Sequence, residues 1–282
     1  MVKVVNEDAK SGGYRAHQLQ TSNDLDFSII TVVYNGEKYI ENTIQSVMSQ
    51  KKKKVEHIII DGGSTDGTVA ILRKYSDKVA YWISEKDKGI YDGMNKGIRL
   101  AHGKYVGILN SDDYYEHENV LNKVFGILED ASTRCVFAHV RFIDPQTKKT
   151  VRVYNSKSNP EKLFRWGFMP AHPTFFAHRD DYLKYGLYKI DYKIAADYEL
   201  LIRFILKFKL PYKRLDEVII VMRTGGASTG GLKSTIHLNK EIIRACRDNG
   251  IYTNFLMLSL KYFRKVAELL PAATGRHNRN SQ

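Results

Sequence analysis

Short apolar runs that alternate with helix-like segments fill the first half of this 282-residue chain and restrict its fold. The runs are rich in β-branched and aromatic residues, as expected of strands that are covered on both faces. Apolar residues recur at helical spacing between them, notably over 37–50 and 94–101. Strands separated by such helices predict βαβ units and a parallel sheet, hence an α/β fold. The four runs cover residues 27–34, 57–61, 79–84 and 105–109.

Polar residues follow three of these predicted strands at the point where each strand ends. Tyr34 and Asn35 follow the first strand, Asp61 ends the second, and residues 110–113 (Asn-Ser-Asp-Asp) follow the fourth. Open parallel sheets bind their ligands outside the carboxyl ends of the strands. The sequence therefore predicts a polar site along this edge of the sheet.

The second half is less regular. Residues 135–143 and 150–154 are typical of two antiparallel strands joined by a turn at Asp144-Pro145. Further along, the patterns predict a helix over 200–209, a strand over 218–222 and a long helical stretch over 236–270. Glycines between the last two mark a flexible loop, at positions 225, 226, 230 and 231.

Composition excludes several classes of protein. A hydrophobic content of 43% is ample for a sizeable core. The only two cysteines, Cys135 and Cys246, cannot form a disulfide framework and are expected to be buried thiols in a reducing compartment. Residues 1–26 lack an apolar segment, and the sequence has no apolar run of about 18 residues, so neither a secretory signal nor a membrane span is expected.

A net charge of +13 indicates anionic partners, and it is unevenly distributed. From Glu199 onward there are 15 Lys and Arg residues against 6 Asp and Glu residues. Residues 251–270 there combine a broad apolar face with a basic one, which suits a helix in a membrane interface and equally a core helix. Because the sequence has no nucleic-acid-binding motif, nucleic acid is not an expected partner.

Two segments carry candidate binding chemistry. Asp112 and Asp113 at the end of a rigid strand could share Mg²⁺ or Mn²⁺, whose coordination is typically completed by substrate phosphates. In residues 84–97, glycines at 89, 93 and 97 would permit close approach to a ligand, and lysines could meet phosphate. No Walker A loop and no G-x-G-x-x-G follows the first strand, which disfavours a nicotinamide-dependent enzyme.

In order and spacing, Tyr34-Asn35, the turn 61–68, the segment 84–97 and the run 110–113 resemble the family 2 glycosyltransferases. The likeness extends over about residues 27–225 and is closest to bacterial enzymes of surface-polysaccharide, O-antigen and capsule assembly. It implies a GT-A fold: a Rossmann-like, mostly parallel central sheet flanked by helices, with a small antiparallel acceptor-side sheet and C-terminal helices.

The resemblance implies roles for residues of the donor half. Asp61 would recognise the nucleotide base, commonly uracil, although Gly62 stands where many relatives have a second acid. Asp112 would bind the metal with Asp113 beside it, and Asn110 replaces the first acid of the family's D-x-D motif. The remaining residues assigned to donor binding are Tyr34, Asn35, Asp87, Asp92, Asn95, Lys96 and Ser111.

The acceptor half would contain the catalytic acid. Asp197 matches the second residue of a Glu-Asp pair in relatives, with Ala196 in the first position, and would act as the base. His172 and Trp166 are weaker candidates for acceptor contacts, and Arg223 for the diphosphate. A carboxylate that removes the acceptor's proton on the face opposite the leaving group implies inversion at the anomeric carbon.

The resulting hypothesis is an inverting, Mn²⁺- or Mg²⁺-dependent transferase that moves a hexose or N-acetylhexosamine from a UDP-sugar to a hydroxyl group. The expected acceptor is a polyprenyl-diphosphate-linked saccharide at the anionic inner face of the cell membrane, with the enzyme cytoplasmic and peripheral. A homodimer is left open. The alternative is a catalytically silent member that binds a nucleotide sugar or acts as a scaffold. The expected divisions are an arm (1–26), a donor half (27–115), an acceptor half (116–231) and basic C-terminal helices (232–282).

Overall fold

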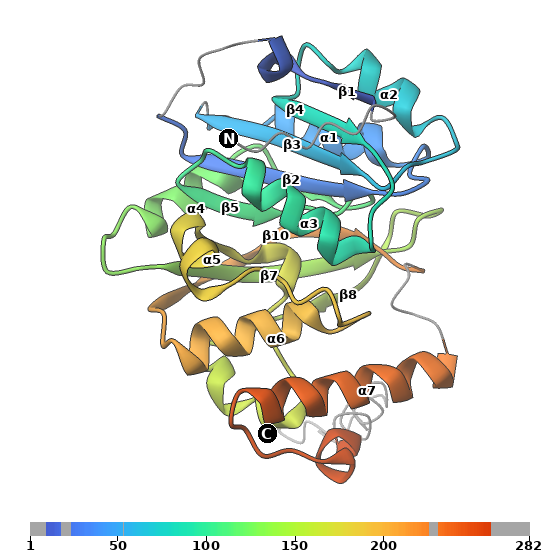
Figure 1. Cartoon of the computed structure of the whole chain (residues 1–282). Coiled ribbons are helices and arrows are strands. Elements are labelled where there is room, and N and C mark those ends of the chain that lie inside the picture. Colours follow the sequence, from blue (N-terminus) through green and yellow to red (C-terminus); the bar gives the residue numbers. More distant parts are fainter. Residues whose placement is uncertain (1–9, 18–23, 53, 226–230, 261–282) are drawn as a thin grey trace, which may run out of the picture.

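A computed structural model describes residues 10–17, 24–52, 54–225 and 231–260, with only the backbone of 231–233. Its centre is one sheet in the order β1-β4-β3-β2-β5-β9-β7-β10-β6, to which β8 is added through β7 (Figure 1). The strands are β1 (Lys10–Gly12), β2 (Phe27–Val33), β3 (Val55–Asp61), β4 (Tyr81–Ser84), β5 (Tyr105–Ile108), β6 (Tyr114–Tyr115), β7 (Cys135–Ile143), β8 (Thr150–Tyr154), β9 (Phe176–His178) and β10 (Tyr212–Arg223).

The long central strands run in one direction, which confirms the predicted parallel sheet. β2 pairs in parallel with β3 and β5, β3 with β4, and β7 with β10. β9 is antiparallel to both β5 and β7, so these two strands also share a direction. The predicted antiparallel pair is β7 and β8, and it belongs to the same sheet rather than to a separate one.

Helices cover both faces of this sheet. They are α1 (Ile40–Met48), α2 (Thr68–Lys74), α3 (Ile90–Leu100), α4 (Val120–Leu128), α5 (Arg179–Tyr185), α6 (Ala196–Ile202) and α7 (Gly231–Asp248). Alternate residues of β2 point to opposite faces. Ile30 and Val32 pack in the core that contains residues of α3, α6 and α7, whereas Phe27 and Ile29 pack with α4.

Close packing of α3 on β2 depends on two glycines. A Cβ atom at Gly97 would lie 2.3 Å from Cγ2 of Ile30, and one at Gly93 would lie 3.1 Å from Cγ1 of Val32. The interpretation that these glycines admit a ligand is therefore wrong, because they face the sheet. Gly89 at the start of the helix has nothing within 4 Å of such a Cβ position and has a φ of 108°.

The predicted long helix over 236–270 is interrupted. α7 ends at Asp248, and Gly250 adopts a φ of 76° while Ile251 N–H bonds to the carbonyl oxygen of Cys246 at 2.8 Å. This left-handed glycine with a bond back into the last turn is a Schellman-type stop. A further helical turn covers 255–260, and the rest of the predicted stretch lies outside the described residues, as does most of the predicted loop 225–231.

The structure bears on three further features: the two cysteines, the apolar character of the helices and the N-terminal arm. Cys135 and Cys246 are both buried free thiols, as expected. In the described ranges, no helix combines the length and the apolar composition needed to cross a membrane. Part of the predicted N-terminal arm is structured, because β1 pairs with β4 at the edge of the sheet.

Candidate active site

The carboxylate of Asp61 orders the turn that follows β3. It is completely buried and accepts hydrogen bonds from Ser64 N–H at 2.9 Å and Ser84 Oγ at 2.5 Å. The Ser64 hydroxyl also donates to it. Since β4 ends at Ser84, opposite Asp61 in the sheet, the carboxylate joins two strand ends. Base recognition by Asp61 stays a prediction.

Asn35 links the end of β2 to the same turn. Its backbone, with a φ of 50°, donates to Ser64 Oγ at 2.7 Å, and its side-chain oxygen accepts from Thr65 N–H at 2.9 Å. An asparagine tolerates this left-handed conformation better than most residues. The neighbouring Tyr34 is 65% exposed, so its ring is accessible to a ligand at this edge.

Asp87 explains the glycine at position 62. A Cβ atom on Gly62 would lie 2.8 Å from Oδ2 of Asp87, so a larger residue there would collide with this carboxylate. Asp87 accepts from Gly89 N–H at 2.9 Å, and burial raises its pKa despite that bond. The departure from a two-acid motif thus coincides with a second carboxylate supplied by the loop after β4.

Two residues of α3 are engaged within the protein rather than open to phosphate. The Asn95 amide donates to the Tyr188 carbonyl oxygen at 2.8 Å and accepts from the Tyr188 N–H at 2.9 Å, so its predicted donor contact is replaced by a structural one. Lys96 pairs with Glu85 at 2.7 Å. Asp92 accepts from Lys88 N–H at 3.0 Å and so holds the first turn of the helix.

The turn at 110–113 offers oxygen atoms suited to a hard cation. Oδ1 of Asn110 and Oδ1 of Asp113 are buried without hydrogen-bond partners, while Asn110 Nδ2 donates to the other oxygen of Asp113 at 3.1 Å. The carboxylate of Asp112 is partly exposed and makes no hydrogen bond or ion pair with any described residue. Burial, and then the charge of Asp112, raise the pKa of Asp113.

These donors fit Mg²⁺ or Mn²⁺ with an incomplete protein shell. Among the described residues, no cluster of three or more His, Cys, Asp or Glu side chains could hold a metal ion. A cation at Asp112, with Asp113 and Asn110 beside it, would need phosphate oxygens to complete its coordination. Ser111, in the same turn, accepts from Thr43 Oγ1 through its carbonyl oxygen at 2.8 Å.

Arg223 stabilises the backbone of this turn. Its guanidinium group donates to the carbonyl oxygen of Asp112 and lies over the rings of Tyr39 and Tyr114, at 4.3 and 5.1 Å from their centroids. Arg223 is buried. Its observed contacts hold the backbone of Asp112, and contact with a diphosphate stays a prediction.

Asp197 stands in the first turn of α6. It accepts from Tyr198 N–H at 2.8 Å, and Tyr91 on α3 places its hydroxyl 3.5 Å from Oδ1. Burial raises the pKa of Asp197, an effect that nearby His172 opposes. His172 is itself buried, with Nε2 2.7 Å from the hydroxyl of Tyr188.

Among the described residues, Trp166 makes no hydrogen bond to Asp197 or to the turn at 110–113. It ends a short 3-10 turn that is tied to the C-terminal segment by the hydroxyl of Thr253, which donates to the Arg165 carbonyl oxygen at 2.6 Å. The Trp166 ring is partly exposed. The same turn is joined to α6 by the Tyr198 hydroxyl, which donates to the Phe164 carbonyl oxygen. An acceptor contact by Trp166 itself stays a prediction.

The predicted residues at the ends of β2, β3 and β5 share one edge of the sheet. β3 ends at Asp61, and β5 leads into the turn at 110–113. Both strands are parallel to β2 and lie on either side of it, so their carboxyl ends are at the same edge with the end of β2 between them. α3 begins at this edge, after β4, and its Tyr91 contacts Asp197. The predicted donor-side helix α3 and the predicted catalytic acid Asp197 are thus in contact, and Tyr91 is a connecting residue that the sequence patterns did not single out.

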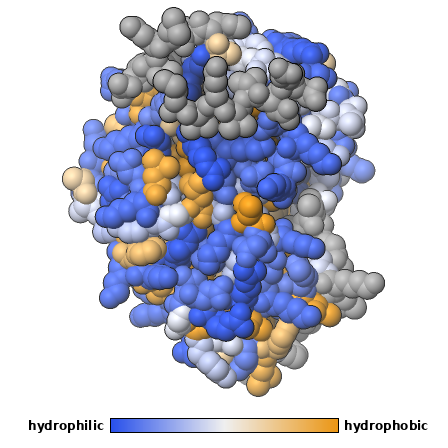
Figure 2. Space-filling model, in the orientation of Figure 1, coloured by the Kyte–Doolittle hydropathy of each residue, from blue (hydrophilic) through white to orange (hydrophobic). Residues whose placement is uncertain are grey.

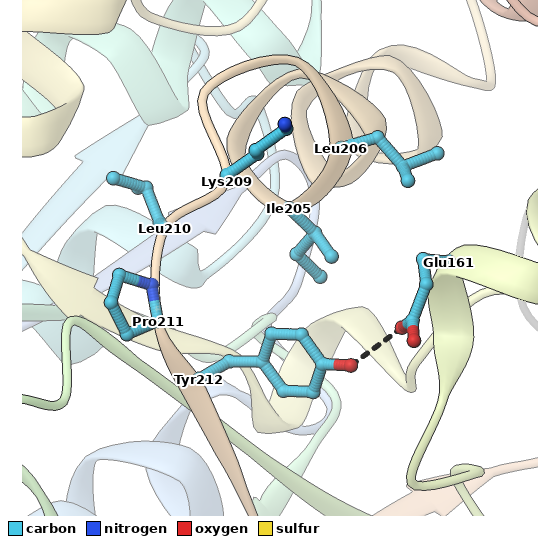
Figure 3. A pocket seen from close by; sticks show the side chains of 7 residues that line it. All are labelled: Glu161, Ile205, Leu206, Lys209, Leu210, Pro211 and Tyr212. Carbon is cyan, nitrogen blue, oxygen red and sulfur yellow. Dashed lines mark hydrogen bonds between the residues drawn. The ribbon is translucent and has the colours of Figure 1, made fainter.

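A separate cavity of about 370 Å³ lies at the opposite edge (Figure 3). Tyr212 in its wall begins β10 and pairs with Cys135, the first residue of β7, which places the cavity at the amino ends of these strands. None of the predicted site residues lines it. Its lining consists of Glu161, Ile205, Leu206, Lys209, Leu210, Pro211 and Tyr212.

Sequence relatives match about two thirds of this chain. An uncharacterised glycosyltransferase of Mycobacterium tuberculosis is 31% identical over 180 residues, covering 62% of this chain and 67% of that protein. Chondroitin synthase of Escherichia coli is 30% identical over 193 residues, which are 68% of this chain but only 28% of the synthase.

Solved structures show the same fold. S. aureus TarS in complex with UDP-GlcNAc matches with a TM-score of 0.62 at 17% identity, over 86% of this chain and 73% of the TarS chain. The mannosyltransferase PcManGT from Pyrobaculum calidifontis, in complex with GDP-Man and Mn²⁺, matches with a TM-score of 0.57 at 15% identity, over 88% and 82% of the two chains.

The family model described as glycosyl transferase family 2 matches residues 28–190, which contain β2, β3, the turn at 110–113 and α3. This region holds the donor-side motifs and makes up more than half of the chain. The protein is a member of glycosyltransferase family 2 with a GT-A fold, related to enzymes of polysaccharide synthesis.

Proposed function

We propose that this protein is an inverting glycosyltransferase that moves a hexose or N-acetylhexosamine from a UDP-sugar to an acceptor hydroxyl. The observation that carries the proposal is the contact between α3 and α6, which joins Asp197 to the donor-side edge through Tyr91. Asp87 and Asp92 flank the start of α3 at that same edge.

In the proposed reaction, Asp197 accepts the proton of the acceptor hydroxyl while that oxygen attacks the anomeric carbon. The bond from this carbon to the nucleoside diphosphate breaks on the opposite face, so the configuration inverts. Burial raises the pKa of Asp197 and makes the carboxylate a stronger base than an exposed one. A positioned general base typically contributes about 10²–10⁴-fold to the rate.

A divalent cation bound at Asp112 would stabilise the negative charge of the departing diphosphate. Asp113 and Asn110 have buried oxygen atoms available beside it. Arg223 holds the backbone carbonyl of Asp112 in place. The TarS complex contains UDP-GlcNAc and the PcManGT complex contains GDP-Man, so the shared fold does not select the nucleotide. The choice of UDP rests on the resemblance of the Asp61 turn to the family's motif.

We extend the proposal to a polyprenyl-diphosphate-linked saccharide acceptor at the anionic inner surface of the cell membrane. Support comes from a set of exposed apolar residues after α7, here called the C-terminal apolar patch: Tyr252, Phe255, Leu256 and Leu260. Figure 2 shows hydrophobic surface at this end of the molecule. The segment from Glu199 onward has a net charge of +9 (15 Lys and Arg against 6 Asp and Glu) out of the +13 of the whole sequence.

The deciding experiment measures nucleoside diphosphate release from a panel of UDP-, GDP- and dTDP-sugars, with and without Mn²⁺, in the presence of a polyprenyl-diphosphate saccharide. Transfer from a UDP-sugar that is lost in Asp197→Asn supports the proposal. Donor binding without turnover under all conditions supports the silent alternative. That alternative drew on Gly62, Asn110 and Ala196, but Gly62 is explained by Asp87, and Ala196 is buried in the core.

A further inference from the structure

The segment that leads into Asp197 is held by a carboxylate from the C-terminal helix. Glu241 on α7 accepts three backbone hydrogen bonds, from Lys193 N–H at 2.7 Å and from Ile194 and Ala195 N–H at 2.9 Å each. Ala195 is the residue that caps α6, and Asp197 follows in the first turn. Residues 193–195 are called the entry loop below.

The Glu241 carboxylate is buried and fully engaged by the entry loop. The residue is 6% exposed, and its carboxylate has His237 Nε2 as a further neighbour at 3.1 Å. Burial alone would raise the pKa of Glu241, but the three N–H groups outweigh burial and lower it. A buried, charged acceptor that satisfies three otherwise unpaired N–H groups fixes the loop in one position.

The rest of the same helix face binds the preceding residues. Arg244 forms an ion pair with Asp191 and lies over the Tyr192 ring at 4.4 Å from its centroid. Asp248 lies 3.4 Å from the Tyr192 hydroxyl. Positions 237, 241, 244 and 248 recur at helical spacing, so α7 presents one continuous polar stripe to this segment. α6 and α7 lie side by side in Figure 1 and share one core.

The opposite side of the entry loop is bound by the donor half. The Tyr91 hydroxyl donates to the Ile194 carbonyl oxygen at 2.5 Å and lies 3.5 Å from Asp197. Ile194 thus donates a hydrogen bond from its N–H to Glu241 and accepts one at its carbonyl oxygen from Tyr91. These two contacts fix the peptide planes that aim the first turn of α6.

We propose that Glu241 is a positioning residue for Asp197, which makes α7 part of the acceptor-side machinery of the enzyme. The inference rests on the proposed function, in which Asp197 is the base. Without the carboxylate, the entry loop loses three bonds and Asp197 shifts relative to the acceptor oxygen. Misplacement of a reacting group by about 1 Å can reduce the rate by ~10²-fold.

The test compares Glu241→Ala and Glu241→Gln with Lys240→Ala, an exposed residue of the same helix. We expect kcat to fall by about 10- to 100-fold in Glu241→Ala and by less in Glu241→Gln, which keeps one acceptor oxygen. KM for the donor and UDP affinity should stay within about twofold of wild type, because the positioning role does not involve donor binding. A general destabilisation of the fold would alter both values. Lys240→Ala should behave as wild type.

The thermal unfolding midpoint is measured for each variant, and assays are run well below it. Unchanged kcat in Glu241→Ala would overturn the proposal, as would a loss confined to donor KM. If Glu241→Ala fails to fold, Glu241→Gln decides by the same criteria. Asp197→Asn separates the two hypotheses: its full activity refutes the base assignment, whereas its inactivity beside an active Glu241→Ala refutes only the positioning role.

Discussion

The hydroxyl group of Tyr91 lies 3.5 Å from the carboxylate of Asp197, although the two residues belong to opposite halves of the domain. Tyr91 is in the first turn of α3, which begins at the donor edge, and its ring stacks on Tyr188 at 5.8 Å between centroids. Asn95, one turn later, binds the backbone of Tyr188 in both directions. α3 therefore contacts both Asp197 and Tyr188, and in the proposed function it connects the donor side to the acceptor side.

Removing this hydroxyl should change the pH dependence of the reaction. The nearby Tyr91 hydroxyl, whose proton is donated to the Ile194 carbonyl oxygen at 2.5 Å, has a minor effect that lowers the pKa of Asp197 against the larger effect of burial. Tyr91→Phe should therefore raise that pKa slightly further. A general base must be deprotonated, so its activity is lost as the pH falls below its pKa. A higher pKa of Asp197 should therefore move the acid limb of the kcat–pH profile to higher pH. His172 and Tyr188, which also face Asp197, are unchanged in this variant. A limb that moves to lower pH would contradict the assignment.

Gly62→Ala tests the contact with Asp87. The added methyl group would lie within 2.8 Å of a carboxylate oxygen, and such overpacking costs about 1–3 kcal/mol of unfolding free energy. Urea unfolding measures this cost, and UDP affinity should weaken because Asp87 is displaced. Gly126→Ala on α4 is the matched control: nothing lies within 4 Å, so a stabilisation of about 0.5–1 kcal/mol is expected. Equal stability of the two variants would contradict the predicted collision between the methyl group at position 62 and the Asp87 carboxylate.

Metal removal should abolish transfer if the turn at 110–113 holds a cation. Chelation with EDTA is expected to reduce nucleoside diphosphate release by at least about 10²-fold, with recovery on addition of Mn²⁺. Asp112→Ala should show the same loss, together with weaker Mn²⁺ binding by electron paramagnetic resonance. Asp77→Ala, which alters an exposed surface carboxylate, should retain both properties. Full activity in EDTA would remove the metal from the mechanism.

Membrane attachment through the C-terminal apolar patch predicts that Leu256→Glu weakens binding to vesicles containing anionic phosphatidylglycerol. Leu256 is 74% exposed, and a charge there would oppose insertion of the patch. Sedimentation with vesicles at low and high salt measures the effect, since the basic surroundings make the binding salt-dependent. Val151→Glu, at a 57% exposed residue of β8, should bind normally. Equal binding by both variants would exclude the patch as the anchor.

The donor half was predictable because its signals are local in sequence. Each parallel strand is a short apolar run followed at once by the residues that it presents, such as Asp61 and Asp112. The spacing of apolar residues therefore predicts the strands of the sheet, and the polar residues at the strand ends predict its ligand-binding edge. The pattern of Asp61 followed three residues later by Ser64 could also have indicated the ordered turn, because short polar side chains commonly bond to nearby backbone.

The acceptor half was less predictable because its contacts are long-range. The family resemblance assigns Asn95 to donor binding, but its amide binds the backbone of Tyr188, whose position no local pattern reveals. Glu241 carries no motif, and its role depends on how α7 docks on α6. The interruption at Gly250 was missed because apolar periodicity continued across it, although glycine is a common helix stop.

The grip of Glu241 on the entry loop has a practical consequence for chimaeric enzymes. The region matched by the family model ends at residue 190, before both Asp197 and the helix that holds its loop. A crossover between α6 and α7 would take the Glu241 carboxylate and the three N–H groups that donate to it from different parents. If the two parts do not fit, a buried charge and three N–H groups lose their partners. Exchange of acceptor specificity between relatives should therefore transplant residues 189–248 as one block.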